Sequence, residues 1–230
     1  ASVAKKWTTS YKEEIIESRV LSTRLLYQSL HKNSNSVKQI ISASAIGIYP
    51  DDLEYIYHET DNKIDDSFLG SVVEQWEKEV DQFEKLQINV AKVRIGIVLA
   101  TEGGALQEMA KPIKLGVGAA FGSGEQYQSW IHIYDLVSIF QFILEHKLFG
   151  VYNAVAPYPV TNAELTKAIA KTLKKPLFLP NIPKFAMKLI LGEMHQILFS
   201  SQHVSCRKLL DLKFQFRYAS LDKALSDLLK

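Results

Sequence analysis

The sequence predicts an α/β fold built on a parallel sheet. Two apolar runs rich in β-branched residues, 37–44 and 88–99, are typical of buried strands. A segment with helical spacing of its apolar residues precedes each run, over 10–31 and 67–86. Because strands that alternate with helices are joined by crossover connections, this order favours neighbouring parallel strands.

Local signals set the expected limits of the first elements. Ser10 and Glu13 have the spacing of a capping box, in which both side chains bind backbone N–H groups. The first helix is therefore expected to begin there and to end near His31. Residues 50–66 are polar and acidic, and we expect them to form a loop without a helix or strand of its own.

Glycine and proline shape the second half of the chain. Six glycines between residues 103 and 124 predict a flexible stretch with a short helix over 106–110. A cluster of three prolines between residues 176 and 183 marks the entry to the last helices. The other elements expected here are strands over 130–133 and 150–155 and helices over 134–145, 161–174, 184–200 and 220–229.

Composition excludes several classes of function. The 230 residues include 27 basic and 25 acidic side chains, for a net charge of +2, so no basic cluster indicates nucleic-acid binding. No apolar run reaches the roughly 18 residues of a membrane span. The single cysteine, Cys206, cannot form an internal disulfide and indicates a reducing, cytoplasmic compartment. The six histidines lack metal-binding spacing, so no metal site is expected.

Short motifs in a fixed order along nearly the whole chain resemble one known family. They are Lys6-Trp7-Thr8, Ser18-Arg19, Ser42-Ala43-Ser44-Ala45-Ile46-Gly47, Trp76-Glu77, Arg94–Leu99, Ser129–Ile133, Tyr152–Pro157 and Leu191–Met194. Together they resemble the epimerase-like branch of the extended short-chain dehydrogenase/reductase superfamily. Its members are usually labelled NAD-dependent epimerase/dehydratase or nucleoside-diphosphate-sugar epimerase.

The resemblance implies a doubly wound, Rossmann-like parallel sheet with a small, mainly helical C-terminal domain. Residues 1–157 would form the NAD(P)-binding domain, with a glycine-rich loop at 103–131 facing the cleft, and residues 158–230 the substrate domain. The implied activity is that of an NAD(P)-dependent nucleotide-sugar epimerase or dehydratase, an oxidoreductase or isomerase. NADP is slightly favoured over NAD, and the partner is a small molecule, such as a nucleotide sugar.

The chain departs from the family pattern at its beginning. The family opens with a strand and a glycine-rich turn whose N–H groups hold the cofactor pyrophosphate. This sequence contains no G-x-G-x-x-G, and Gly116–Phe121 comes closest without the third glycine or a preceding strand. We therefore expect the sheet to lack its first strands and the chain to be a fragment.

A second departure concerns the chemistry. Related dehydrogenases use a tyrosine and a lysine four residues later, and the lysine charge lowers the pKa of the phenol. None of the ten tyrosines here is followed by lysine at that spacing, and Leu69 and Val73 occupy the corresponding places. The alternative function is therefore a non-catalytic dinucleotide-binding protein that acts as a sensor or scaffold.

Two residues are candidates for catalysis. Ser44 closes a strand at the position that resembles the catalytic serine of the superfamily, where its hydroxyl would orient a substrate oxygen. A serine that merely ends a strand is the structural alternative. Tyr49 is the nearest phenol and would stand in as the acid or base, unless it only covers the site.

The resemblance also implies residues that bind the ligands. Ser42, Ala43, Arg94 and Gly96 are candidates for the cofactor, although Arg94 within an apolar strand equally suits a structural ion pair. Candidates for the substrate are Lys114, Ser123, Gln126, Trp130 and His132. For His132 and its neighbour Asp135, fixing the strand-to-helix turn is the structural alternative, and Asp135 suits a helix cap.

Overall fold

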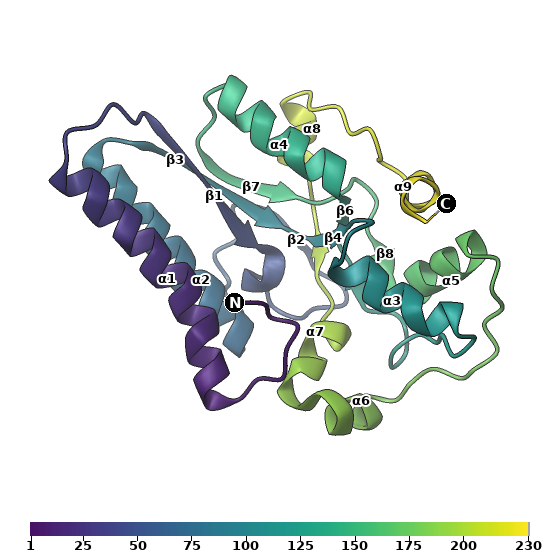
Figure 1. Cartoon of the computed structure of the whole chain (residues 1–230). Helices are drawn as coiled ribbons and strands as arrows, with labels where there is room; N and C mark the ends of the chain where they lie inside the picture. The colour runs from purple at the N-terminus through teal and green to yellow at the C-terminus, as the bar shows by residue number, and fades with distance from the viewer. Residues whose placement is uncertain (230) are drawn as a thin grey trace.

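The computed structural model describes residues 1–229, and its centre is a three-stranded parallel sheet (Figure 1). The strands are β1 (Gln39–Ala45), β3 (Asn89–Ile95) and β7 (Gly150–Ala154), in the order β1-β3-β7. Ser44 lies opposite Arg94 in the register of β1 and β3, and Arg94 lies opposite Asn153 of β7. The α/β class and the parallel sheet predicted from the sequence are confirmed.

Helices cover both faces of this sheet. Helices α1 (Thr9–Lys32) and α2 (Phe68–Asp81) lie side by side on one face (Figure 1), and α4 (Ile133–Glu145) packs on the other. Side chains alternate along β3, so that Val90 packs with α1 and α2 while Ala91 and Val93 pack with α4. The sheet is therefore buried on both sides, which explains the near-continuous apolar strands.

Three short strand pairs extend this frame. Gly96 separates β3 from β4, which turns away to pair with a different partner. The pairs are β4 (Ile97–Leu99) with β6 (Trp130–His132), β2 (Ile56–Tyr57) with β9 (His203–Val204), both parallel, and β5 (Tyr127–Gln128) with β8 (Val160–Thr161), antiparallel.

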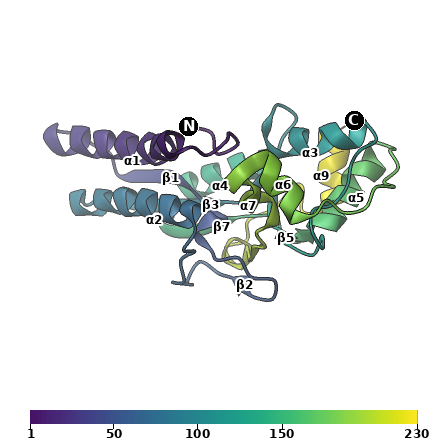
Figure 2. The ribbon, with the colours of Figure 1, turned by 90° about the horizontal axis from the view of Figure 1, so that it is seen from below.

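The remaining helices lie toward the other end of the molecule, as Figure 2 shows for α5 (Asn162–Thr172) and α9 (Leu221–Leu228). Helices α3 (Gly104–Lys114), α5 and α9 share a core around Trp130 and Leu165. Because this core contains residues from both sides of residue 157, the predicted domain division there stays a prediction. The other helices are α6 (Lys184–Leu191), α7 (Gln196–Phe199) and α8 (Arg207–Asp211), with 3-10 turns at Ile46–Ile48, Gln82–Leu86 and Gly192–His195.

Several predicted element limits were wrong. Thr8, not Ser10, caps α1, and its side chain accepts a hydrogen bond from the Tyr11 N–H at 3.2 Å. Helix α3 is longer than the predicted 106–110: it continues through Pro112, which removes one backbone N–H donor without ending the helix. The predicted loop 50–66 contains β2, whose partner β9 lies far away in the sequence.

Residues 1–229 lack two features that would indicate a membrane or a metal site. None of the helices there combines the length and the apolar character that a bilayer crossing needs. The same residues contain no group of three or more His, Cys, Asp or Glu side chains placed to hold a metal ion.

Candidate functional site

A cleft of about 280 Å³ opens at the carboxyl ends of β1 and β3. Its walls come from the 3-10 turn that follows β1, from the junction of β3 and β4, and from the first turns of α2. In open α/β sheets, ligands bind outside the carboxyl ends of the strands. The topology therefore places this cleft where this class of fold binds its ligands.

Two glycines keep the cleft open. Gly96 lies at the junction of β3 and β4, and a Cβ there would overlap the carbonyl oxygen of Ser129. Gly47 follows β1, and a Cβ there would lie 3.9 Å from Leu69 Cβ and 4.0 Å from Val73 Cγ2. Gly96 is thus required by the backbone, whereas Gly47 leaves free room between the sheet and α2.

The α2 wall of the cleft is apolar. Leu69, Val72 and Val73 line it, and Leu69 and Val73 are the residues for which the family resemblance implies the places of the tyrosine and lysine. The side chains of Leu69 and Val73 can neither donate nor accept a proton. Proton transfer in this cleft would need another group.

One cation faces the cleft from α1. The Arg19 guanidinium lies over the Trp76 ring at 5.5 Å from its centroid, and its Nη1 donates to the Ile15 carbonyl oxygen at 2.8 Å. Burial lowers the pKa of Arg19 from its ordinary value, with a smaller opposing effect from Tyr11. The side chain stays charged at any physiological pH, because even a lowered arginine pKa lies far above neutrality.

One carboxyl group also lines the cleft, that of Asp65. Its backbone N–H donates to the Ile48 carbonyl oxygen at 2.8 Å, and its carboxylate accepts a hydrogen bond from the Ser67 hydroxyl. Gly70 in α2 has no side chain to keep the Asp65 carbonyl away, since a Cβ there would overlap it. Burial raises the pKa of Asp65, and the hydrogen bonds from Ser67 oppose this shift.

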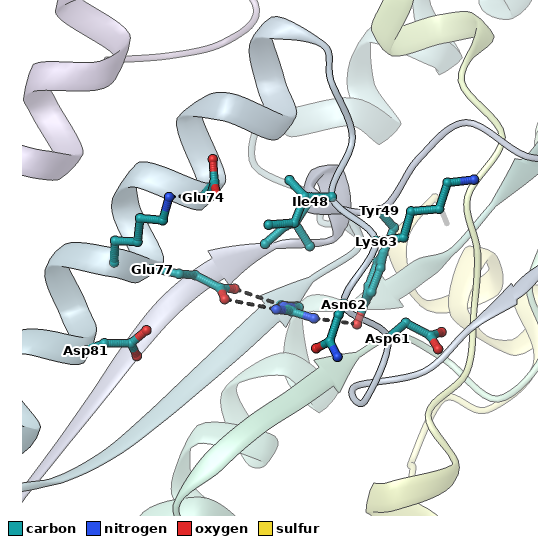
Figure 3. A pocket seen from close by; sticks show the side chains of 11 residues that line it. Ile48, Tyr49, Asp61, Asn62, Lys63, Glu74, Glu77 and Asp81 are labelled. Atoms are coloured by element: carbon teal, nitrogen blue, oxygen red, sulfur yellow. Dashed lines mark hydrogen bonds and ion pairs between the residues drawn. The ribbon is translucent and has the colours of Figure 1, made fainter.

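Beneath the cleft, five buried polar side chains form one hydrogen-bonded network. Glu77 of α2 accepts from Arg94 Nε and Nη2, both at 2.9 Å, and from the Ser44 hydroxyl at 2.5 Å. Arg94 Nη1 donates to the Tyr49 hydroxyl at 2.9 Å, and that hydroxyl donates to Asn153 Oδ1 at 2.8 Å. Figure 3 shows the dashed bonds from Glu77 and Tyr49 meeting at the guanidinium between them.

The network fixes the charge state of its members. Burial opposes ionisation of Glu77, but Arg94, Ser44 and Lys92 outweigh it and hold the pKa of Glu77 below its ordinary value. Burial would lower the pKa of Arg94, and the hydrogen bond to Glu77 reverses this and raises it. Burial raises the pKa of Tyr49 despite the neighbouring Arg94. At neutral pH the network therefore contains one carboxylate, one guanidinium and a protonated phenol.

The structure brings Ser44, Tyr49 and Arg94 into one hydrogen-bonded network, away from the cleft. Ser44 and Tyr49 are buried, and none of the three lines the cleft. Tyr49, Glu77 and Arg94 instead line a second, smaller cavity of about 210 Å³ (Figure 3). Arg94 forms the structural ion pair that the sequence left open as an alternative. The catalytic roles of Ser44 and Tyr49 stay predictions.

Of the other predicted cofactor residues, Gly96 lines the cleft and two do not. Ser42 and Ala43 lie further back in β1, opposite Lys92 and Val93 of β3, and neither is among the residues that line it.

The predicted substrate residues lie outside the cleft. Gln126 is buried and donates to the Leu198 carbonyl oxygen at 3.0 Å, and Trp130 is fully buried and donates to the Tyr158 carbonyl oxygen at 3.1 Å. Lys114 ends α3 and Ser123 follows it in a loop, and both are exposed. Substrate binding by these residues therefore stays a prediction.

His132 holds the strand-to-helix turn, whereas Asp135 binds a different segment of the chain. His132 caps α4, and its Nδ1 accepts a hydrogen bond from the Tyr134 N–H at 3.0 Å. The prediction that Asp135 caps this helix was wrong. Its buried carboxylate accepts from the backbone N–H groups of Arg217 and Tyr218, both at 2.8 Å, and so anchors the C-terminal segment.

Sequence reasoning missed Arg19, Asp65 and Tyr127 as cleft residues. A signal existed for Arg19, because it follows the fully buried Ile15 by four residues and so lies on the same helix face. No local pattern marks Asp65 or Tyr127, since only the tertiary fold brings their loops to the cleft.

Comparisons with known proteins agree with this architecture. The C-terminal residues 182–228 match the family described as Domain of unknown function (DUF1731). An epimerase family protein of Staphylococcus aureus strain NCTC 8325 is 38% identical over 231 residues, which cover 100% of this chain and 77% of the relative.

Two solved structures are similar over nearly the whole chain. The human epimerase family protein SDR39U1 (isoform 2), crystallised with NADPH, has a TM-score of 0.90 and 30% identity, over 99% of this chain and 77% of the human one. A nucleoside-diphosphate sugar epimerase from Corynebacterium glutamicum has a TM-score of 0.78 and 31% identity, over 98% of this chain and 44% of its own. The chain therefore belongs to the epimerase family within the extended short-chain dehydrogenase/reductase superfamily.

Proposed function

We propose that this protein binds NAD(P) and a nucleotide sugar in the cleft at the carboxyl ends of β1 and β3, and acts as an NAD(P)-dependent epimerase-like enzyme. The position of this cleft carries the proposal, since it is where α/β sheets of this kind bind ligands. Its apolar wall could pack against the ring of a ligand, and its few polar groups could orient that ring. The family membership supports the same class of ligand.

NADPH is the favoured cofactor. The human relative, 30% identical, was crystallised with NADPH. Gly47 is the observation of this chain that fits a nicotinamide, because it leaves room between the sheet and α2 that any larger side chain would fill. When bound, the nicotinamide supplies hydride transfer. Gly47, Gly96 and the apolar α2 wall would hold its ring.

Asp65 is the group we propose for proton transfer. It is the carboxyl side chain that lines the cleft, and its raised pKa brings it closer to the operating pH of an acid–base catalyst. As a sugar carbon gives up its hydride to the oxidised cofactor, NADP⁺, the proton of the attached hydroxyl would pass to an oxygen of ionised Asp65. The Ser67 hydroxyl donates to this carboxylate and would hold it in place.

A second function is favoured by Leu69 and Val73. Because aliphatic side chains replace the usual tyrosine and lysine, the cleft would bind a dinucleotide without turnover, as in a sensor or scaffold. Incubation with UDP-glucose or UDP-N-acetylglucosamine plus NADP⁺, followed by proton NMR of the sugars, separates the two functions. A new epimer or a keto sugar supports the enzyme, whereas NADPH binding with no altered sugar supports the second function.

We also propose a cytoplasmic location. The one cysteine, Cys206, is a buried free thiol, and burial raises its pKa to about 11, so it is inert as well as unpaired. A chain without disulfides suits a reducing compartment.

A further inference from the structure

The guanidinium of Arg19 is a cation in the cleft without an acidic partner. Within residues 1–229, no carboxylate oxygen lies within 4.0 Å of it, whereas Arg24, five residues along the same helix, pairs with Glu79. The contacts of Arg19 are to neutral groups, namely the carbonyl oxygens of Ile15 and, at 3.5 Å, of Ala1, the Ser18 hydroxyl at 3.3 Å and the face of Trp76. An unneutralised, partly buried cation in a cleft is a binding site for an anion.

The surroundings of Arg19 also hold it in one orientation. Nη1 is fixed by the Ile15 carbonyl oxygen and the plane lies over the Trp76 ring, which leaves Nε and Nη2 without hydrogen bonds inside the described chain. A guanidinium with two free donors and a fixed plane matches the paired oxygens of a phosphate group. Arg19 and Trp76 both line the cleft, together with Gly47 and Asp65.

From this geometry we propose that Arg19, supported by Trp76, binds a phosphate group of the ligand that occupies the cleft. The inference deepens the proposed function and rests on it for the class of ligand. The phosphate comes either from the diphosphate of a nucleotide sugar or from the dinucleotide cofactor. Both sources present the same oxygens, and separate titrations distinguish them.

The test is isothermal titration calorimetry of the whole chain with UDP and, separately, with NADPH. Replacing Arg19 with glutamine should weaken binding of at least one ligand by about 10- to 100-fold, the effect of losing hydrogen bonds to a charged group. Arg19→Lys should give an intermediate loss, because it keeps the charge but not the planar fork. The matched control is Arg24→Gln, which removes the same charge from the same helix outside the cleft and should change binding less than about two-fold.

Melting temperatures distinguish binding from a structural role. Arg19 has no ion pair to lose, and its hydrogen bond to Ile15 and its contact with Trp76 contribute only modestly, so Arg19→Gln without ligand should melt close to wild type. A clear fall in the melting temperature of Arg19→Gln together with unchanged affinity for both ligands would assign Arg19 to the fold and overturn the proposal.

The remaining outcomes of the titrations also test the phosphate site. Unchanged affinity of Arg19→Gln for both ligands, or no binding of either ligand by the wild type at millimolar concentration, contradicts the phosphate site. If UDP binds through Arg19 while NADPH does not bind, the site stands and the proposed cofactor-dependent function fails. If NADPH binds equally to wild type and to Arg19→Gln while UDP binds to neither, the phosphate site fails and the proposed cofactor binding stands.

Discussion

Glu77 and Arg94 join helix α2 to strand β3 through two parallel hydrogen bonds of 2.9 Å. Both side chains are buried, and Ser44 and Tyr49 bind their remaining polar atoms. Because α2 also carries Leu69 and Val73 into the cleft, this ion pair sets the distance between the sheet and one wall of the site. It is the structural support of the cleft.

Glu77→Gln should be strongly destabilising. It removes the carboxylate and leaves the Arg94 charge buried without a counter-charge, which lowers the free energy of unfolding by about 3–5 kcal/mol. Urea unfolding at pH 7 measures the loss. Glu79→Gln, which breaks an exposed pair with Arg24, is the control and should unfold close to wild type. Equal losses in both variants would contradict the structural role of the buried pair.

The same pair predicts the acid sensitivity of the protein. Since the pKa of Glu77 is lowered in the folded state, its contribution to stability is complete above the unfolded value of about 4.3 and is lost as the pH falls below it. The stability difference between wild type and Glu77→Gln should therefore shrink below about pH 4.3. A difference that stays constant down to pH 3 would show that ionised Glu77 does not stabilise the fold.

Ser44→Ala tests the role implied by the family against the contact in the structure. The hydroxyl of Ser44 donates to Glu77 at 2.5 Å, so its loss should lower the free energy of unfolding by about 1–3 kcal/mol. Binding of NADPH should not change, because Ser44 does not line the cleft. Wild-type stability combined with abolished turnover would instead restore Ser44 as a catalytic residue.

The sequence predicts the strands and helices around the sheet well, because the apolar runs of β1 and β3 and the helical spacing in α1 and α2 are local signals. It cannot place Ser44 relative to Glu77 or bring Asp65 to the cleft, since those contacts depend on how α2 and its preceding loop pack. Glu77 itself was detectable, because it follows Val73 by four residues on the buried face of α2. The pairing of β2 with β9 joins segments too short and too distant to be recognised locally.

Asp65→Asn should separate binding from chemistry. If Asp65 moves the proton, the variant should bind NADPH like wild type and produce at least about 100-fold less altered sugar, since asparagine cannot accept the proton. Because the raised pKa means that ionised Asp65 destabilises the fold, Asp65→Asn should be at least as stable as wild type at pH 7. Unchanged turnover in the NMR assay would exclude Asp65 from proton transfer.

Asp135→Asn should loosen the C-terminal segment. One of the two backbone N–H groups, of Arg217 or Tyr218, would lose its acceptor, at a loss of about 1–3 kcal/mol. Hydrogen exchange should then speed up at those amides and in α9. Asp211→Asn, which breaks an exposed pair with Arg207, serves as the control and should leave exchange there unchanged. Slow exchange in Asp135→Asn would show that the segment is held by its apolar packing alone.

The central claim is that the cleft at the carboxyl ends of β1 and β3 is the ligand site, and Gly47 gives the most direct test of it. Thermal melts of wild type, Gly47→Ala and Gly47→Phe would be compared with and without NADPH. At about 100 times its dissociation constant, NADPH should stabilise wild type by about 2.7 kcal/mol. Gly47→Ala, whose Cβ fits at 3.9 Å from Leu69, should shift similarly, and Gly47→Phe, which fills the cleft, should not shift. An equal shift in Gly47→Phe, or none in wild type, would contradict the claim.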